Sequence, residues 1–286
     1  MSSQLDALRE SLSAMDKEKP YFKALIYGPS GVGKTVLAAT AGKNFLLVDS
    51  NDGWVSLINH PELRSNGTRM PYEGLSQIEA ICDAVEKQEA PFNGFDTIII
   101  DEASTISVLD LDVVLASRSK KDPSKDPNIA TLPDFGANTE RCRRAFNRLL
   151  SLPVNVILTA HVREDKDDRT GTMYIRSSFT PKLRQNILRL VHICGHLTMN
   201  EETNKDGETV FVRKLQLTPS RNIEAKSRLE LPSFIENPDL GVIISDWVDS
   251  DGVEVITETE PLELEEELSA SETPTNESVD TGTLEL

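Results

Sequence analysis

The sequence predicts an α/β protein with a mostly parallel central sheet and helices on both faces of that sheet. Short runs rich in Val, Ile and Leu recur along the chain, for example TIII at residues 97–100 and VIL at residues 156–158. The segments between them carry apolar residues at spacings of three and four, as amphipathic helices do. Strands that are apolar along their whole length and alternate with helices are typical of a parallel sheet covered on both faces. The hydrophobic share of 38% over 286 residues is enough for such a core.

Four strands and four helices are expected in the first part of the chain. The expected strands are 22–28, 44–50, 95–104 and 154–162, and the expected helices are 34–43, 76–88, 107–119 and 137–152. After residue 190 the pattern changes to shorter strands with a turn at NKDGE (204–208), which predicts an antiparallel extension on the C-terminal side.

The formal charge of −17 is unevenly distributed along the chain. Residues 249–286 contain thirteen Asp or Glu and no Lys or Arg, which leaves 34 acidic against 30 basic residues, about −4, for residues 1–248. A segment this acidic and this poor in aromatic residues is expected to be disordered. We therefore expect an N-terminal helical arm at 1–20, a folded core at 21–248 and an acidic tail at 249–286.

The tail has three interpretations. It keeps the protein soluble, or it folds back on a basic groove and competes there with a polyanion. A third use is the recruitment of a partner, such as a single-strand-binding protein. Net charge therefore does not exclude DNA as a ligand.

The sequence favours a cytoplasmic protein without a membrane partner. It has no run of about 18 apolar residues that could span a bilayer. Its N-terminus lacks the basic and apolar regions of a secretory signal. Cys82, Cys142 and Cys194 lie far apart and do not form an even disulfide framework, which suits a reducing compartment.

The segment GPSGVGKT at residues 28–35 matches the phosphate-binding pattern G-x-x-x-x-G-K-[ST] between an expected strand and an expected helix. Backbone N–H groups of such a loop surround phosphate oxygens. We expect Lys34 to reach the β- and γ-phosphates and the Thr35 hydroxyl to bind Mg²⁺. The pattern therefore predicts ATP and Mg²⁺ as cofactors. The residues expected to contact the nucleotide are Gly28, Pro29, Ser30, Gly31, Val32, Gly33, Lys34, Thr35 and Val36.

Two acids follow the apolar run TIII. Asp101 is expected at the carboxyl end of the strand beside the P-loop, where its carboxylate binds the nucleotide's Mg²⁺ together with Thr35. Glu102 comes next and is expected to orient or deprotonate the attacking water. The alternatives are a capping role for Asp101 and a catalytic base supplied by another strand.

Polar residues also end the next buried strand, VILTAHV. Thr159 and His161 are expected near the γ-phosphate, and His161 is a candidate relay between the nucleotide and the loop that follows. A purely structural histidine is the alternative.

The order of these motifs, followed by PKLRQNILRLVHICGHL, resembles phage P-loop nucleotide-binding proteins with a RecA-like core, several of which are single-strand annealing recombinases. The resemblance spans about residues 20–248. It implies a RecA-like P-loop ATPase core that assembles as a homo-oligomer, either a ring or a filament, and binds single-stranded DNA with ATP. If the protein is phage-encoded, its compartment is the host cytoplasm.

The resemblance also implies a role for Lys226 and Arg228 in AKSRLELP. A similar K-x-R in RecA-like assemblies reaches the γ-phosphate of a neighbouring subunit. A solvated surface pair is the alternative. The chain departs from its relatives at Asn51, where they tend to carry an acid. Either Asp49, Asp52 or Glu102 therefore acts as the base, or hydrolysis is slow.

Two basic segments, which follow the expected strands 95–104 and 154–162, are candidate DNA-binding loops. Their cations can bind phosphates, and their aromatic side chains can stack on bases. Ordinary solvated helix faces are the alternative. The candidate DNA-binding residues are Arg118, Lys120, Lys121, Arg143, Arg163, Arg169, Tyr174, Arg176, Phe179, Lys182 and Arg184.

The sequence therefore predicts an ATP-dependent, single-stranded-DNA-binding protein that promotes annealing and hydrolyses ATP weakly. A P-loop DNA motor or helicase-type ATPase is the second hypothesis. The third is a nucleotide-gated interaction protein that does not bind DNA.

Overall fold

One ten-stranded sheet forms the centre of the protein in the computed structural model, which describes residues 20–203 and 207–249. The strands follow the order β10-β8-β7-β1-β5-β4-β2-β3, with β6 paired to β5 and β9 paired to β7. Their bounds are β1 (Lys23–Gly28), β2 (Phe45–Asp49), β3 (Gly67–Pro71), β4 (Thr97–Asp101), β5 (Asn155–Lys166), β6 (Met173–Ser177), β7 (Ile193–Thr203), β8 (Thr209–Gln216), β9 (Lys226–Ser227) and β10 (Phe234–Glu236). The six strands from β7 to β3 in this order pair in parallel. Strands β6, β8, β9 and β10 pair antiparallel.

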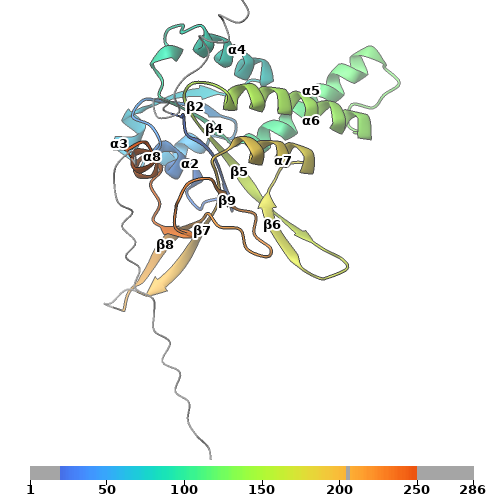
Figure 1. The fold of residues 1–286 in the computed structure, drawn as a ribbon. Coiled ribbons are helices and arrows are strands. Elements are labelled where there is room, and N and C mark those ends of the chain that lie inside the picture. Colours follow the sequence, from blue (N-terminus) through green and yellow to red (C-terminus); the bar gives the residue numbers. More distant parts are fainter. Residues whose placement is uncertain (1–19, 204–206, 250–286) are drawn as a thin grey trace, which may run out of the picture. The chain divides into compact units, whose positions relative to one another are not determined.

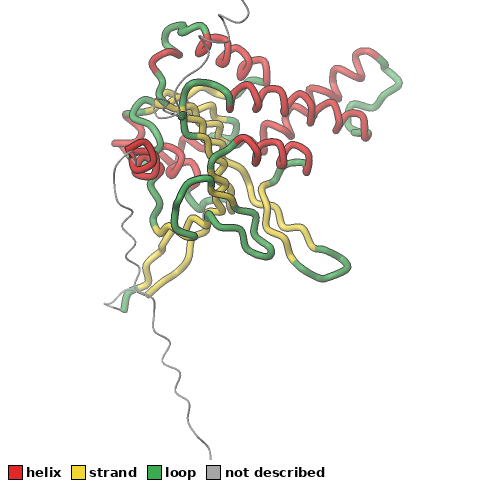
Figure 2. The backbone as a smooth tube through the Cα atoms, in the orientation of Figure 1, coloured by secondary structure: helices red, strands yellow, loops and turns green. Residues whose placement is uncertain are grey.

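Helices cover both faces of the sheet (Figures 1 and 2). One hydrophobic cluster packs four helices, α4 to α7, on one face, and a second packs α2, α3, η2 and α8 on the other. The bounds are α2 (Lys34–Ala39), η2 (Gly53–Leu57), α3 (Pro61–Ser65), α4 (Leu75–Glu86), η3 (Phe92–Gly94), α5 (Ala103–Lys121), α6 (Leu132–Leu150), α7 (Pro181–Leu190) and α8 (Leu240–Asp249).

The apolar strands of the sequence are buried on both faces because alternate side chains enter opposite clusters. Leu25 and Tyr27 of β1 belong to one cluster, and Ala24 and Ile26 belong to the other. Burying one Leu or Ile side chain contributes about 1.5–3 kcal/mol, so these runs fix the centre of the sheet. The predicted fold class, a mostly parallel α/β sheet with a C-terminal antiparallel extension, is confirmed.

The register of the sheet brings the ends of β1, β2 and β4 and the middle of β5 to one edge. Gly28 at the end of β1 lies opposite His161 of β5, and Asp49 at the end of β2 lies opposite Asp101 of β4. Strands β5 and β7 continue past this edge and pair with β6 and β8, forming two hairpins that project from the sheet (Figure 1).

Several elements differ from the expected ones. Both long helices begin earlier, at Ala103 and at Leu132, where a capping box between Thr131 and Asp134 starts α6. Strands β3, β6 and β10 and helices α3, α7 and α8 were not predicted. Most of the predicted arm (1–20) and tail (249–286) lies outside the described residues.

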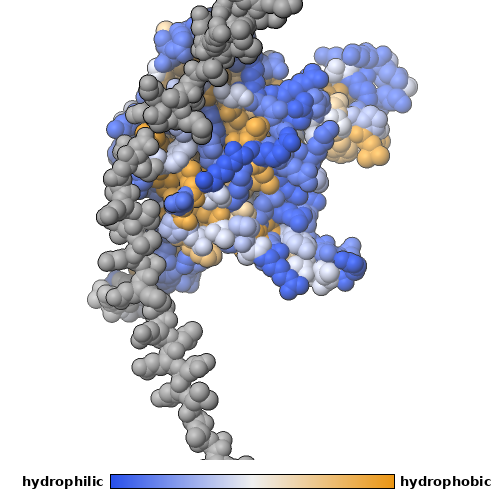
Figure 3. All heavy atoms as spheres, viewed as in Figure 1, coloured by the Kyte–Doolittle hydropathy of each residue, from blue (hydrophilic) through white to orange (hydrophobic). Residues whose placement is uncertain are grey.

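Exposed apolar side chains gather at the projecting end of α5 and α6 (Figure 3). Leu132 is 88% exposed, and Ile129 and Phe135 are also exposed.

Candidate nucleotide-binding site

The P-loop, residues 28–35, joins the buried strand β1 to helix α2 at the edge where the strand ends converge. Gly33 has a φ of 96°, a left-handed conformation that favours glycine. Gly33 is the N-cap of α2 and contributes no side-chain atom of its own to the loop.

Lys34 is buried at the start of α2. Its Nζ donates hydrogen bonds to the carbonyl oxygens of Gly28 and Pro29 at 3.1 and 3.0 Å. The same Nζ lies 3.4 Å from Oε1 of Glu102. The ammonium charge is therefore held between the P-loop and the acid that follows β4.

Asp101 ends β4 and is 2% exposed. Its Oδ2 accepts a hydrogen bond from the Thr35 hydroxyl at 2.8 Å, and its Oδ1 accepts one from the Thr159 hydroxyl at 2.5 Å. Burial raises the pKa of the Asp101 carboxyl, and the two threonine hydrogen bonds oppose that rise. The predicted partners of the metal site therefore lie in direct contact.

Gly53 approaches this carboxylate closely. A Cβ on Gly53 would lie 2.0 Å from Oδ2 of Asp101 and 3.2 Å from Oγ1 of Thr35. The backbone of the loop after β2 therefore forms one wall of the Asp101 site, and a larger residue does not fit there.

Glu102 follows β4 and lies between Lys34, at the start of α2, and His161 of β5. Its Oε2 lies 2.6 Å from Nε2 of His161 and accepts a hydrogen bond from the Ser104 hydroxyl at 3.4 Å. Burial raises the pKa of Glu102, while the charges of Lys34 and His161 lower it. Within the described residues, its buried Oε1 has no hydrogen-bond partner.

The residues present fit a nucleoside triphosphate with Mg²⁺. Mg²⁺ prefers oxygen ligands, and the Thr35 hydroxyl and the Asp101 carboxylate supply them side by side. Lys34 supplies a cation at the P-loop for the phosphates. Oε1 of Glu102 lies 3.4 Å from the Lys34 ammonium but makes no hydrogen bond within the described residues, so it can still accept one from a water molecule.

The other candidate bases are differently placed. Asp49 is 3% exposed, and its carboxylate accepts hydrogen bonds from the backbone N–H groups of Asn51 and Gly53 and from Nε of Arg69. The side chain of Asp52 is 76% exposed and pairs with the same arginine. Among the three acids, Glu102 alone contacts Lys34 in the described part of the chain.

The family described as AAA domain matches residues 21–229. The chain belongs to the AAA domain family. Among solved structures it is similar to the flagellar accessory protein FlaH from Methanocaldococcus jannaschii, with 12% identity and a TM-score of 0.36 over 77% of this chain and 87% of that chain. It is also similar to the ATPase DotB from Legionella pneumophila, with 13% identity and a TM-score of 0.27 over 74% of this chain and 48% of that chain. None of the curated proteins matches the chain.

Lys226 and Arg228 of this AAA domain lie away from its P-loop. In the antiparallel pairing of β9 with β7, Lys226 lies opposite Cys194. Cys194 is near the start of β7, so Lys226 lies at the amino edge of the sheet. Its Nζ donates to the carbonyl oxygens of Leu188 and of Val191, the latter at 2.8 Å, and Arg228 donates to the carbonyl oxygen of Arg189. Both cations therefore satisfy backbone acceptors at the C-terminal end of α7.

Replacing Lys226 with alanine should lower the free energy of unfolding by about 1–3 kcal/mol, because two carbonyl groups lose their donor. Urea unfolding measures this loss. Lys182→Ala is the matched control, since Lys182 is an exposed lysine on α7, the helix whose end Lys226 contacts. Equal stability of the two variants would contradict a structural role for Lys226.

The candidate DNA-binding residues on α5 and α6 are partly engaged within the chain. Arg118 pairs with Asp134 and donates to two carbonyl groups of the connecting loop. Arg143 pairs with Glu140, three residues earlier on the helix. Lys120 and Lys121 are exposed at the end of α5.

The β5–β6 hairpin carries four candidates. Arg163 is exposed and pairs with Asp165 in β5, and Arg169 is exposed in the connecting turn. The Arg176 guanidinium lies 4.5 Å from the centre of the Tyr174 ring in β6. These side chains therefore share a projection that begins directly after His161.

Two candidates are corrected by their burial. Phe179 is 2% exposed and packs edge-to-face against Phe146 in the core. Arg184 is 8% exposed and lies 3.2 Å from the Glu224 carboxylate. Neither side chain is available to DNA, because both fill the interior beneath α7.

Arg213 of β8 lies at the P-loop and was missed by the sequence analysis. Its Nε donates a hydrogen bond to the Val32 carbonyl oxygen at 3.1 Å. A single arginine in an amphipathic strand carries no local signal, and its position depends on β8 folding beside the P-loop.

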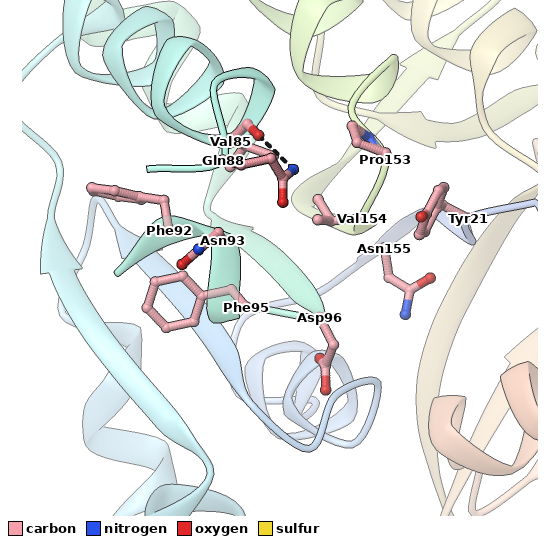
Figure 4. Close-up of a pocket in the computed structure, with 10 residues that line it drawn as sticks. All are labelled: Tyr21, Val85, Gln88, Phe92, Asn93, Phe95, Asp96, Pro153, Val154 and Asn155. Carbon is pink, nitrogen blue, oxygen red and sulfur yellow. Dashed lines mark hydrogen bonds between the residues drawn. The ribbon is translucent and has the colours of Figure 1, made fainter. Parts of the chain in front are cut away.

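A cavity of about 370 Å³ lies at the opposite edge of the sheet (Figure 4). It is lined by residues before or at the starts of β1, β4 and β5, including Tyr21, Asp96 and Asn155. Two of its polar side chains are engaged within the chain, since Asn155 accepts from the backbone of Phe22 and Asp96 from that of Lys43. We assign this cavity no role in the nucleotide site.

Among the described helices of this AAA domain, none is both long enough and apolar enough to cross a membrane.

Proposed function

We propose that this AAA domain protein is an ATP- and Mg²⁺-dependent ATPase that assembles on single-stranded DNA and promotes strand annealing. One observation carries the nucleotide part of the proposal. Asp101 and Glu102 are adjacent, yet their carboxylates have different partners, the Thr35 and Thr159 hydroxyls for the first and Lys34 and His161 for the second.

In this proposal the two acids have separate tasks. Bound Mg²⁺ would neutralise phosphate charge, and Thr35 and Asp101 would hold it. Lys34 would leave the carbonyl oxygens of the P-loop and contact phosphate oxygens. Glu102 accepts a proton from the attacking water through Oε1, and His161 holds the other oxygen of the same carboxylate. General-base catalysis of this kind contributes about 10²–10⁴-fold to a rate.

The β5–β6 hairpin supports the DNA part of the proposal. It continues from the strand that carries His161, so a change at Glu102 can reach the hairpin through one side chain. Its exposed arginines and Tyr174 offer charge for phosphates and a ring for a base. The resemblance to annealing recombinases supports annealing and assembly as a homo-oligomer, with Arg228 reaching a neighbour's nucleotide.

Replacing Arg163, Arg169 and Arg176 with alanine should weaken single-stranded DNA binding uniformly across sequences. The slope of log affinity against log salt should become less steep by about 2, because each phosphate contact contributes about 0.7. Fluorescence anisotropy with an oligonucleotide at several salt concentrations, with ATP and Mg²⁺ present, measures the slope.

A matched control removes three exposed cations elsewhere, with Lys43, Arg64 and Lys87 replaced by alanine. An unchanged slope in the hairpin variant would contradict hairpin binding. A wild-type protein that never binds DNA would favour a nucleotide-gated interaction protein, and directional unwinding would favour a motor.

A further inference from the structure

Arg213 is placed at the P-loop by two neighbouring strands and a turn. In β8 it lies opposite Met199 of β7. Its backbone N–H donates to Oδ1 of Asn237 at 3.3 Å, and its carbonyl oxygen accepts from the N–H of Asn237 at 2.7 Å. The backbone of Arg213 is therefore held on both sides, and its side chain starts from a fixed point.

The guanidinium group of Arg213 lies against the loop itself. Besides the hydrogen bond to the Val32 carbonyl oxygen, its Nε lies 2.6 Å and its Nη2 3.3 Å from the position that a Cβ of Gly33 would occupy. The guanidinium therefore borders the backbone that a phosphate chain must approach, on the side of β8.

The charge of Arg213 has no carboxylate partner among the side chains described in residues 20–203 and 207–248, whereas Lys34 is paired with Glu102. Its one hydrogen bond within the P-loop uses Nε, and the guanidinium carries further N–H donors on its two terminal nitrogens. Guanidinium groups form short, charge-assisted hydrogen bonds with phosphate oxygens. A partly buried cation beside a phosphate-binding loop, with donors to spare, is suited to a polyphosphate ligand.

We infer that Arg213 is a nucleotide-binding residue that contacts the phosphate chain of a nucleotide held in the P-loop of its own chain. The inference rests on the proposed nucleotide binding and extends it to β8, outside the P-loop and the two acids. The antiparallel extension then forms part of the site, because β8 is one strand of it.

Isothermal titration of the full chain with Mg·ATP tests the inference, with adenosine as a competitor that lacks phosphate. Arg213→Gln removes the charge and keeps an amide donor for the Val32 carbonyl oxygen. Arg213→Lys keeps the charge, and Arg221→Gln is the matched control because Arg221 is exposed elsewhere. We expect Arg213→Gln to lower the affinity for Mg·ATP about tenfold to hundredfold, Arg213→Lys to lower it less, and neither to change the affinity for adenosine.

Two results would overturn the inference while the proposed function stands. Wild-type affinity for Mg·ATP in Arg213→Gln would mean that Arg213 only anchors the loop. An equal loss for ATP and adenosine would mean that it contacts the nucleoside instead. A wild-type protein that does not bind Mg·ATP would overturn the proposed function itself.

Protection of the wild-type side chain provides a measurement that needs no variant. Mg·ATP should slow the modification of Arg213 by phenylglyoxal, followed by mass spectrometry, and adenosine should not. Equal modification with and without Mg·ATP would contradict the inference even if the glutamine variant does not fold.

Discussion

Replacing Glu102 with glutamine should lower the rate of ATP hydrolysis about 10²–10⁴-fold and leave Mg·ATP binding nearly unchanged. The amide has the same shape but cannot accept a proton from water. Asp101 and Thr35, which hold the predicted metal site, keep their contacts in this variant. Phosphate release and a nucleotide titration on the same preparation measure the two effects separately.

Asp52→Asn is the matched control, because Asp52 is the exposed acid in the loop after β2 and pairs with Arg69. Its hydrolysis rate should equal that of the wild type. A normal rate in Glu102→Gln, or a large loss of rate in Asp52→Asn, would indicate that the catalytic base is an acid of the loop after β2.

The pH dependence should follow from the same residue. Burial raises the pKa of Glu102 above the ordinary value of 4.5. A base must be deprotonated to act, so hydrolysis should be fully present above that raised pKa and fall as the pH decreases through it. The acid limb of the wild-type profile should therefore lie above pH 4.5, and the residual activity of Glu102→Gln should lack it. An acid limb retained in the variant would assign it to another group, such as Asp101, whose pKa is also raised.

The sequence is sufficient to predict the centre of the sheet and the candidate site because both depend on local patterns. An apolar run such as TIII is a buried strand, and parallel strands end at one edge. Asp101 and His161 were therefore expected beside the P-loop, and the register of the sheet brings these segments together.

The features that sequence analysis missed depend on contacts between distant segments. Arg213 reaches the P-loop only because β8 pairs with β7, which lies beside β1. Phe179 seemed to be an aromatic residue among exposed cations, but the chain turns inward after β6 and buries it against Phe146. Strand β6 itself was missed because its residues are only partly apolar and pair with the projecting half of β5.

Replacing Gly53 with alanine should disrupt the metal side of the site through a single methyl group. The new Cβ would lie 2.0 Å from Oδ2 of Asp101, far inside van der Waals contact, so either the carboxylate or the loop must move. Overpacking of this kind costs about 1–3 kcal/mol. Because Asp101 is held by two threonine hydroxyls, its displacement breaks contacts that position the predicted Mg²⁺ ligands. We expect the Mg²⁺-dependent part of ATP affinity to fall about tenfold to hundredfold.

Titration with ATP in Mg²⁺ and in EDTA isolates that part, since the P-loop contacts act in both conditions. Gly136→Ala is the matched control, because a Cβ at Gly136 in α6 meets nothing within 4 Å. This control should bind ATP normally and be stabilised by about 0.5–1 kcal/mol, because alanine is the better helix residue. If Gly53→Ala keeps the full Mg²⁺ dependence of ATP binding but unfolds more easily, the loop after β2, and not Asp101, moves to make room for the new methyl group. The close approach of Gly53 would then serve only the packing of that loop.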